Sequence, residues 1–202
     1  PVSCTEQFFQ LNNQIEIAVV EGAGHLPHLS QGEKTLDLIS SFLQRQNYQL
    51  DKARVAESFG RAAQRYNKAA VLQHRVGEKL LTGLSSDNAL DTVIDLGCGT
   101  GYHCPHLQEQ YPSAKVTGVD ISPAMLAYAA TQYPQGNWLC ADAENLPLED
   151  NSQSLVFSNF ALQWCEDLDQ LAAQLYRVLK PQGQLCFAVP GPETLKELRS
   201  AW

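Results

Sequence analysis

From about residue 89 onward, apolar runs of strand length alternate with segments in which apolar side chains recur at helical spacing. Such alternation is typical of a doubly wound α/β fold, a parallel sheet with helices on both faces. It predicts strands at 92–96, 115–120, 137–141, 154–159 and 184–189, and helices at 102–111, 123–133, 168–179 and from 193 to 202. Ser122 before Pro123 predicts a helix start, because serine caps helices and proline is tolerated in the first turn. Pro181, Gln182 and Gly183 are expected to separate the third helix from its strand.

The segment before this sheet, residues 51–84, has apolar spacing that predicts a helix interrupted near Tyr66 and Asn67. Its basic residues recur at short helical intervals, so on a continuous helix they would share one face. They are Arg54, Arg61, Arg65, Lys68, Arg75 and Lys79. A solvated helix face explains such a stripe, and so does a docking strip for an acidic partner.

The first 50 residues have a different pattern. They predict a strand at 14–20, a loop at 22–29 that contains glycine and histidine, and an amphipathic helix at 33–44. One strand and one helix provide too little apolar surface for a core of their own. We therefore expect residues 1–50 to be the C-terminal remnant of another domain and residues 51–202 to be a second domain.

The composition is that of an ordinary globular protein, with 44% hydrophobic and 18% charged residues among 202. A formal net charge of -8 argues against a general nucleic-acid binder, which needs a basic surface. The six cysteines have no zinc-ligand spacing, so we expect no metal site and free thiols in a reducing cytoplasm. No apolar run approaches the about 20 residues that span a bilayer, so no membrane association is expected.

One loop carries the strongest chemical signal. The segment VIDLGCGTG, at residues 93–101, is an apolar strand that ends in Asp95 and leads into three closely spaced glycines. Dinucleotide folds prefer G-x-G-x-x-G, where a helix start meets a pyrophosphate, whereas the spacing here is G-x-G-x-G. An acid two residues before the first glycine is a poor neighbour for a pyrophosphate. It suits a cationic ligand.

Two further acids end the next strands. Asp120 closes the second strand about 20 residues after the loop, where a carboxylate can accept hydrogen bonds from both ribose hydroxyls. Asp142 follows the third strand, where it could accept a hydrogen bond from an adenine amino group. The carboxyl ends of strands are where ligands bind in open α/β sheets, so the three acids predict a site for a cationic nucleoside.

At these residues the chain resembles the class I S-adenosylmethionine-dependent methyltransferases. The likeness covers about residues 51–202 and rests on VIDLGCGTG, VTGVDIS, ADAENLPL and LYRVLKPQG. It implies a Rossmann-like sheet, with S-adenosylmethionine as the cofactor. It also implies that Gly97, Gly99 and Gly101 pass beneath the methionine part of the cofactor, while Asp95 helps to orient its amino group.

For the nucleoside, the same resemblance implies that Asp120 binds the ribose and that Asp142 with the backbone of Ala143 reads the adenine edge. Ile121 and Met125 would flank the adenine. Plain core packing is the alternative for Ile121 and Met125, and a cap or turn is the alternative for the acids.

Two further segments, SFGRAAQRY at 58–66 and SNFALQWC at 158–165, resemble the malonyl-acyl carrier protein O-methyltransferases of biotin synthesis. The resemblance implies methylation of the free carboxylate of a malonyl group on acyl carrier protein, an acidic partner for the basic stripe. Tyr66 would contact cofactor or substrate, and Asn159 and Gln163 would line the rim where the methyl is transferred. No general base is expected, because a carboxylic acid with a pKa of about 4 is already ionised at neutral pH.

Other functions stay open on the sequence. The domain could methylate another small metabolite such as a quinone precursor, or it could be a non-catalytic domain that senses S-adenosylmethionine or serves as a scaffold. An NAD-binding oxidoreductase is disfavoured by the glycine spacing and by Asp95.

Near the start, EGAGHLPHLSQ at residues 21–31 resembles the histidine loop of α/β-hydrolases, and His25 matches the triad histidine. The resemblance suggests a fusion with an esterase similar to pimeloyl-acyl carrier protein methyl ester esterase. The chain has no G-x-S-x-G nucleophile elbow, so the hydrolase part is expected to be incomplete and inactive. The methyltransferase sheet is likewise expected to lack its last two strands, so both ends are predicted to be cut and this chain to bind its cofactor weakly.

Overall fold

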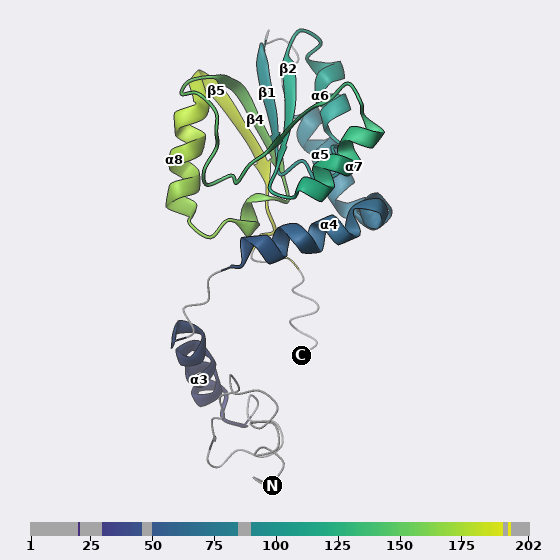
Figure 1. Cartoon of the computed structure of the whole chain (residues 1–202). Helices are drawn as coiled ribbons and strands as arrows, with labels where there is room; N and C mark the ends of the chain where they lie inside the picture. The colour runs from purple at the N-terminus through teal and green to yellow at the C-terminus, as the bar shows by residue number, and fades with distance from the viewer. Residues whose placement is uncertain (1–19, 21–29, 46–49, 85–89, 192–193, 195–202) are drawn as a thin grey trace. The chain divides into compact units, whose positions relative to one another are not determined.

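The computed structural model describes residues 20, 30–45, 50–84, 90–191 and 194, and the chain divides into two compact units, residues 1–49 and 50–202 (Figure 1). In the first unit, helix α3 (Gly32–Arg45) confirms the helix predicted at 33–44. Leu36 and Ile39 on α3 are both more than half exposed. The predicted strand at 14–20, apart from its last residue, and the loop that contains His25 lie outside the described residues.

The second unit is built on a five-stranded sheet whose neighbours all pair in parallel, in the order β3-β2-β1-β4-β5. The strands are β1 (Thr92–Leu96), β2 (Lys115–Asp120), β3 (Asn137–Cys140), β4 (Gln153–Asn159) and β5 (Leu179–Ala188). The predicted doubly wound sheet is therefore confirmed, and β1 and β2 have the predicted bounds.

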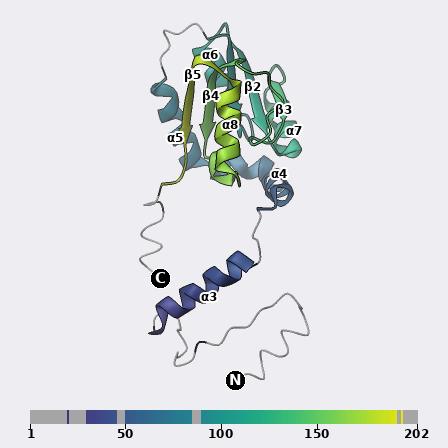
Figure 2. The same ribbon diagram turned by 90° about the vertical axis from the view of Figure 1, so that its left-hand side faces the viewer.

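Helices cover both faces of the sheet (Figures 1 and 2). The helices on the faces are α5 (Val71–Thr82), α6 (Cys104–Gln110), α7 (Pro123–Gln132) and α8 (Leu168–Val178). Helix α4 (Lys52–Ala69) runs across the end of the sheet (Figure 1). The core forms two layers, as expected for a central sheet. One packs side chains of α5, α6 and α7 against β1 and β4, and the other packs α8 against the opposite sides of the same strands. As predicted, Ser122 caps α7 by accepting a hydrogen bond from the Met125 amide.

The connection from β3 to β4 crosses the α8 face as an extended segment. Leu146 from this segment is buried in the core. The Arg177 guanidinium of α8 donates hydrogen bonds to the carbonyl oxygens of Leu146 and Leu148, at 2.7 and 2.6 Å. Side chains of α8 therefore satisfy backbone groups that a crossover helix would have paired internally.

Two predicted boundaries differ from the structure by more than two residues, and the helix predicted at 193–202 lies, apart from residue 194, outside the described residues. The interruption of the first helix lies at Ala70 rather than near Tyr66 and Asn67, because α4 runs on to Ala69. The basic stripe is thus divided between two helices instead of following one. Strand β5 begins at Leu179, immediately after α8, so residues 181–183 lie within the strand. Gln182 there has a φ of 68° beside a shift in the β4–β5 register, and this irregularity accommodates the segment.

Among the described residues, no helix is both long and apolar enough to cross a membrane.

Candidate functional site

A pocket opens at the carboxyl ends of the strands, and side chains of α4 and of the start of α5 form its roof. Helix α4 runs across this end of the sheet in Figure 1. The floor of the pocket comes from the ends of β1, β2, β3 and β4. The residues that line it are Lys52, Val55, Phe59, Tyr66, Gln73, His74, Leu96, Gly97, Gly99, Thr100, Tyr102, His103, Val119, Asp120, Ile121, Met125, Ala141, Asp142, Ala143, Asn159, Phe160, Ala161, Leu162, Trp164 and Cys165.

The glycine loop after β1 has a backbone that other residues rarely adopt. Gly97, Gly99 and Gly101 have φ angles of 75°, 53° and 74°. At Gly97 a Cβ would lie 2.1 Å from the Ala161 Cβ, whereas at Gly99 it would meet no atom within 4 Å. Gly97 is therefore required by close packing, while the space beside Gly99 is open.

Asp120 fastens this loop to β2. One carboxylate oxygen accepts from the Gly99 amide and the other from the Ser122 amide, both at 2.8 Å. Burial raises the pKa of Asp120, and the two amide hydrogen bonds act in the opposite direction. Each oxygen of a carboxylate can accept twice, so one acceptor position on each stays free for a ligand.

Asp95 lies deeper. Its side chain is only 1% exposed and accepts a hydrogen bond from the Cys104 thiol at 3.5 Å. Burial raises the pKa of Asp95 to about 7. The hydrogen bond from Cys104 lowers this pKa, and the nearby negative charge of Asp120 raises it further. Asp95 is not among the residues that line the pocket. Any influence on a ligand must therefore act from beneath the loop.

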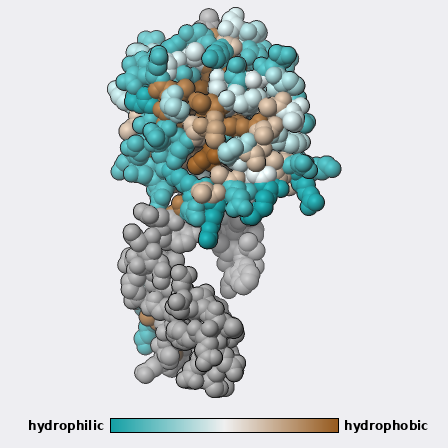
Figure 3. All heavy atoms as spheres, in the orientation of Figure 1, coloured by the Kyte–Doolittle hydropathy of each residue, from teal (hydrophilic) through white to brown (hydrophobic). Residues whose placement is uncertain are grey.

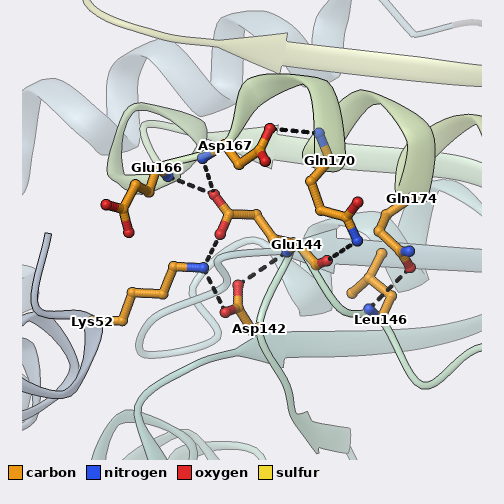
Figure 4. A network of polar contacts seen from close by, with 8 residues as sticks. All are labelled: Lys52, Asp142, Glu144, Leu146, Glu166, Asp167, Gln170 and Gln174. Carbon is orange, nitrogen blue, oxygen red and sulfur yellow. Dashed lines mark hydrogen bonds and ion pairs between the residues drawn. The ribbon is translucent and has the colours of Figure 1, made fainter. Parts of the chain in front are cut away.

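Lys52, in the first turn of α4, is the centre of a charged network (Figure 4). Its ammonium contacts the carboxylates of Asp142, at 2.6 Å, and of Glu144. Glu144 is buried, and its other oxygen accepts from the amides of Glu166 and Asp167 at the start of α8. Lys52 thus ties the roof helix to the loop after β3 and to the N-terminus of α8.

Three more contacts fix α4 above the sheet. The Ser122 hydroxyl donates to the carbonyl oxygen of Ala56 at 2.8 Å, and Gly60 allows α4 to approach Ala124 so closely that a Cβ would lie 2.9 Å away. Near the end of α4, the Thr100 hydroxyl donates to Asn67 at 2.6 Å. The helix is therefore attached in turn to the ends of β3, β2 and β1.

At the other end of the pocket, His103 and Asn159 form a buried polar wall. The Asn159 amide group donates to the carbonyl oxygen of Gln73 at 2.8 Å and lies 3.3 Å from His103 Nε2. His103 Nδ1 and Asn159 Oδ1 are buried without a partner among the described residues. Burial lowers the pKa of His103 to about 4, so its ring is neutral at physiological pH. Because Nε2 faces an amide donor, the ring proton belongs on Nδ1.

Three aromatic side chains close the roof. Phe59 packs edge-on against Tyr66 and against Trp164, with ring centroids 6.0 and 5.4 Å apart. Burial and the nearby Asp120 charge raise the pKa of Tyr66, which keeps its hydroxyl protonated. This end of the pocket is therefore lined by aromatic rings, of which Trp164 is 43% exposed.

Most residues predicted for the site lie together in this pocket. The lining contains Tyr66, Gly97, Gly99, Asp120, Ile121, Met125, Asp142, Ala143 and Asn159. Asp95 and Gly101 lie outside the lining, and so does Gln163, an exposed residue whose amide donates to the Phe160 carbonyl oxygen.

Several lining residues are not among those predicted from the sequence, including Lys52, Phe59, His103 and Trp164. For Lys52, the helical spacing in the sequence does indicate an inward position. At 3.6 residues per turn it lies almost opposite Arg54, so it belongs to the inward face of α4 and not to the basic stripe. His103 carries no comparable sequence signal, because only the approach of α5 brings it into the wall.

Comparison with known proteins identifies the domain. Residues 94–187, from β1 to β5, match the family model described as a methyltransferase domain. The S-adenosylmethionine-dependent methyltransferase of Mesorhizobium loti has a TM-score of 0.51 and 32% identity, over 57% of this chain and 53% of that one. This part of the chain is therefore similar to a methyltransferase domain and to a solved S-adenosylmethionine-dependent methyltransferase.

A further solved structure supports the fold of the methyltransferase domain. A methyltransferase from Haloferax volcanii, in complex with the Trm112 methyltransferase activator, has a TM-score of 0.60 and 25% identity. The match covers 69% of this chain and 66% of that one. The predicted Rossmann-like architecture is thereby confirmed.

Curated relatives are similar over more of the chain. The biotin biosynthesis bifunctional protein BioHC of Cellvibrio japonicus is 39% identical over 203 residues, which cover all of this chain and 40% of that protein. The malonyl-[acyl-carrier protein] O-methyltransferase of Methylovorus sp. is 45% identical over 164 residues, 76% of this chain and 55% of that protein. The chain thus spans about half, or less, of the length of these relatives.

Proposed function

We propose that the methyltransferase domain transfers a methyl group from S-adenosylmethionine to the free carboxylate of malonyl-acyl carrier protein, an early step of biotin biosynthesis in the cytoplasm. The observation that carries the proposal is the pocket beneath α4, in which Asp120 and Asp142 flank an open glycine loop. The similarity to an O-methyltransferase of that name supports this choice of substrate. The name BioHC supports a second proposal, that residues 1–50 derive from an esterase that removes the same methyl ester.

The nucleoside end of the pocket fits this cofactor. The free acceptor positions of Asp120 suit the two hydroxyls of a ribose, and the open space beside Gly99 lets the ligand approach the backbone. Ile121, Met125, Asp142 and Ala143 all line the pocket, which supports the proposal that the first two flank the adenine and the last two bind its amino edge.

At the end of the pocket where the methionine part would bind, Asp95 is not part of the lining. The glycine loop separates this carboxyl group from the pocket, and its raised pKa of about 7 leaves it only partly ionised near neutral pH. We propose that a cationic ligand above the loop favours the ionised form of Asp95. Gly97 and Gly101 shape the loop above it. When bound, S-adenosylmethionine supplies an electrophilic methyl group on a sulfonium.

To methylate a carboxylate, the protein needs to orient the acceptor and to exclude water, and it needs no general base. A malonyl carboxylate is ionised at neutral pH. The raised pKa of Tyr66 and the lowered pKa of His103 leave both of these groups uncharged beside it. Phe59 and Trp164 exclude water, so that a carboxylate held in line gains from proximity, an effect of roughly 7 to 11 kcal/mol in well-oriented reactions.

The test uses purified protein with methyl-labelled S-adenosylmethionine and two carrier substrates. Malonyl-acyl carrier protein is expected to acquire a label that mild alkali releases as methanol, as an ester does. Acetyl-acyl carrier protein, which lacks the second carboxylate, serves as the matched control and should stay unlabelled. No label on the malonyl substrate, or equal label on both, would refute the proposed reaction.

A further inference from the structure

The basic residues of the roof helices divide into two groups once the structure is known. Four of the five basic residues of α4 occupy a sector of about 60°, on the face opposite the buried Ala63, while Lys52 faces inward. Arg54 pairs with Asp51, and Arg61 pairs with Glu57. Within the described part of the chain, the remaining four cations, Arg65, Lys68, Arg75 and Lys79, have no ion-pair partner. Arg65, Lys68 and Arg75 lie within five residues of the break at Ala70, whereas Lys79 lies in the last turn of α5.

The same break exposes apolar surface. Val71 and Leu72, the first two residues of α5, are 58% and 60% exposed. Lys68 precedes them by one turn and Arg75 follows by one turn. We call the surface formed by Arg65, Lys68, Val71, Leu72 and Arg75 the elbow surface. It combines an apolar centre with a positively charged rim.

The elbow surface adjoins the pocket. Gln73 and His74, which lie between Leu72 and Arg75 in the sequence, both line it. Residues 51–84 contain seven Lys and Arg against three Asp and Glu, whereas the whole chain has a formal net charge of -8. Hydrophilic side chains lie along the edge of the domain (Figure 3) where α4 runs in Figure 1. Positive charge is therefore concentrated beside the site that receives the substrate.

We infer that the elbow surface docks the acidic carrier protein that delivers the malonyl thioester. The inference rests on the proposed function and names where the partner binds. The cations steer and hold an acidic helix, and Val71 with Leu72 packs against the apolar side chains of that helix. The flexible arm of the carrier then reaches the pocket past Gln73 and His74. The one acid of α5, Glu78, is engaged elsewhere, because it accepts a hydrogen bond from the Tyr102 hydroxyl at 3.0 Å.

The test compares two double charge reversals on purified protein. The Lys68→Glu/Arg75→Glu variant alters the elbow surface, and Arg54→Glu/Arg61→Glu makes the same charge change at the paired cations. For malonyl-acyl carrier protein we expect the elbow variant to raise KM about tenfold with little change in kcat, and the control to change KM by less than about threefold. With malonyl-coenzyme A, a small thioester that needs no docking, both variants should match wild type.

A second measurement keeps the inference testable if a variant folds poorly. Salt should raise the wild-type KM for the carrier substrate and leave that for the small thioester unchanged. Equal effects of both variants, or a salt-independent KM for the carrier, would overturn the docking inference. Wild-type protein that methylates neither malonyl substrate would instead refute the proposed function.

Discussion

At the scale of single residues, the protonation of Asp95 is the feature with the clearest consequence. Burial raises its pKa to about 7 from 3.8, so the folded protein takes up a proton between these values. A group with a raised folded-state pKa stabilises the fold fully below its unfolded pKa. That contribution is lost as the pH rises through the folded pKa, and for a shift of this size it amounts to as much as about 4 kcal/mol.

We therefore expect the Asp95→Asn variant to lose this pH dependence. Its free energy of unfolding relative to wild type should shift in favour of the variant by about 3 kcal/mol between pH 5 and pH 8. Urea titrations at the two pH values measure the difference, with Glu109→Gln, a change at an exposed acid, as the control. An unchanged difference at both pH values would show that Asp95 is ionised throughout.

Residues also differ in how well the sequence revealed them. Asp120 and the glycines were predictable because each is marked by its place at a strand end. Gln163 was expected at the rim, but a single 3-10 turn over Leu162–Trp164 points Trp164 toward the pocket instead. Which side chain of so short a turn faces the pocket is determined by tertiary packing rather than by local sequence.

At the scale of elements, helix α4 is held above the sheet by Lys52. The Lys52→Met variant should lower the free energy of unfolding by about 2 kcal/mol, because the buried Glu144 loses its cation. The loss is smaller than for a fully buried pair, because Lys52 is 25% exposed and water screens its charge. The same change should also weaken binding of S-adenosylmethionine, since the roof and Asp142 are then no longer tied together.

The matched control is Arg54→Met, two residues further along α4. Arg54 and Asp51 form an exposed pair, so removing that pair should change stability by less than about 1 kcal/mol. Chemical unfolding and calorimetric titration compare the two variants. Equal losses in both would contradict a special role for Lys52.

Helix α5 reaches its place through Gly77. A Cβ there would lie 2.2 Å from His103 Nε2, so the Gly77→Ala variant should be destabilised even though alanine favours helices by about 1 kcal/mol. Adding His103→Ala removes the obstacle, and the double variant should recover part of the loss. Thermal unfolding of the two single variants and the double variant gives the coupling. Strict additivity would mean that the helix has moved aside.

Element boundaries were predictable only where local signals dominate. Strands β1 and β2 are short apolar runs closed by an acid, and their bounds agree with the structure. The sequence predicts the break between α4 and α5 near Tyr66 and Asn67, whereas it lies at Ala70. In the structure Asn67 bonds Thr100 and Tyr66 lines the pocket, so tertiary contacts hold both in the helix.

At the scale of the whole molecule, the doubly wound fold followed from the alternation of apolar runs, and the site from the acids at the strand ends. The segment that replaces a crossover helix between β3 and β4 had no such signal. It depends on Arg177 and Gln174 of α8, which bond its backbone from a distant part of the chain.

The central claim is that the pocket around Asp120 binds S-adenosylmethionine and methylates a malonyl carboxylate. Label transfer to malonyl-acyl carrier protein, measured side by side for wild type and Asp120→Asn, tests it most directly. We predict alkali-labile label with the wild type and a rate lower by about 100-fold in the variant, since two charge-assisted hydrogen bonds are weakened. Transfer at the wild-type rate by Asp120→Asn, or an absence of alkali-labile label with wild-type protein, would contradict the account.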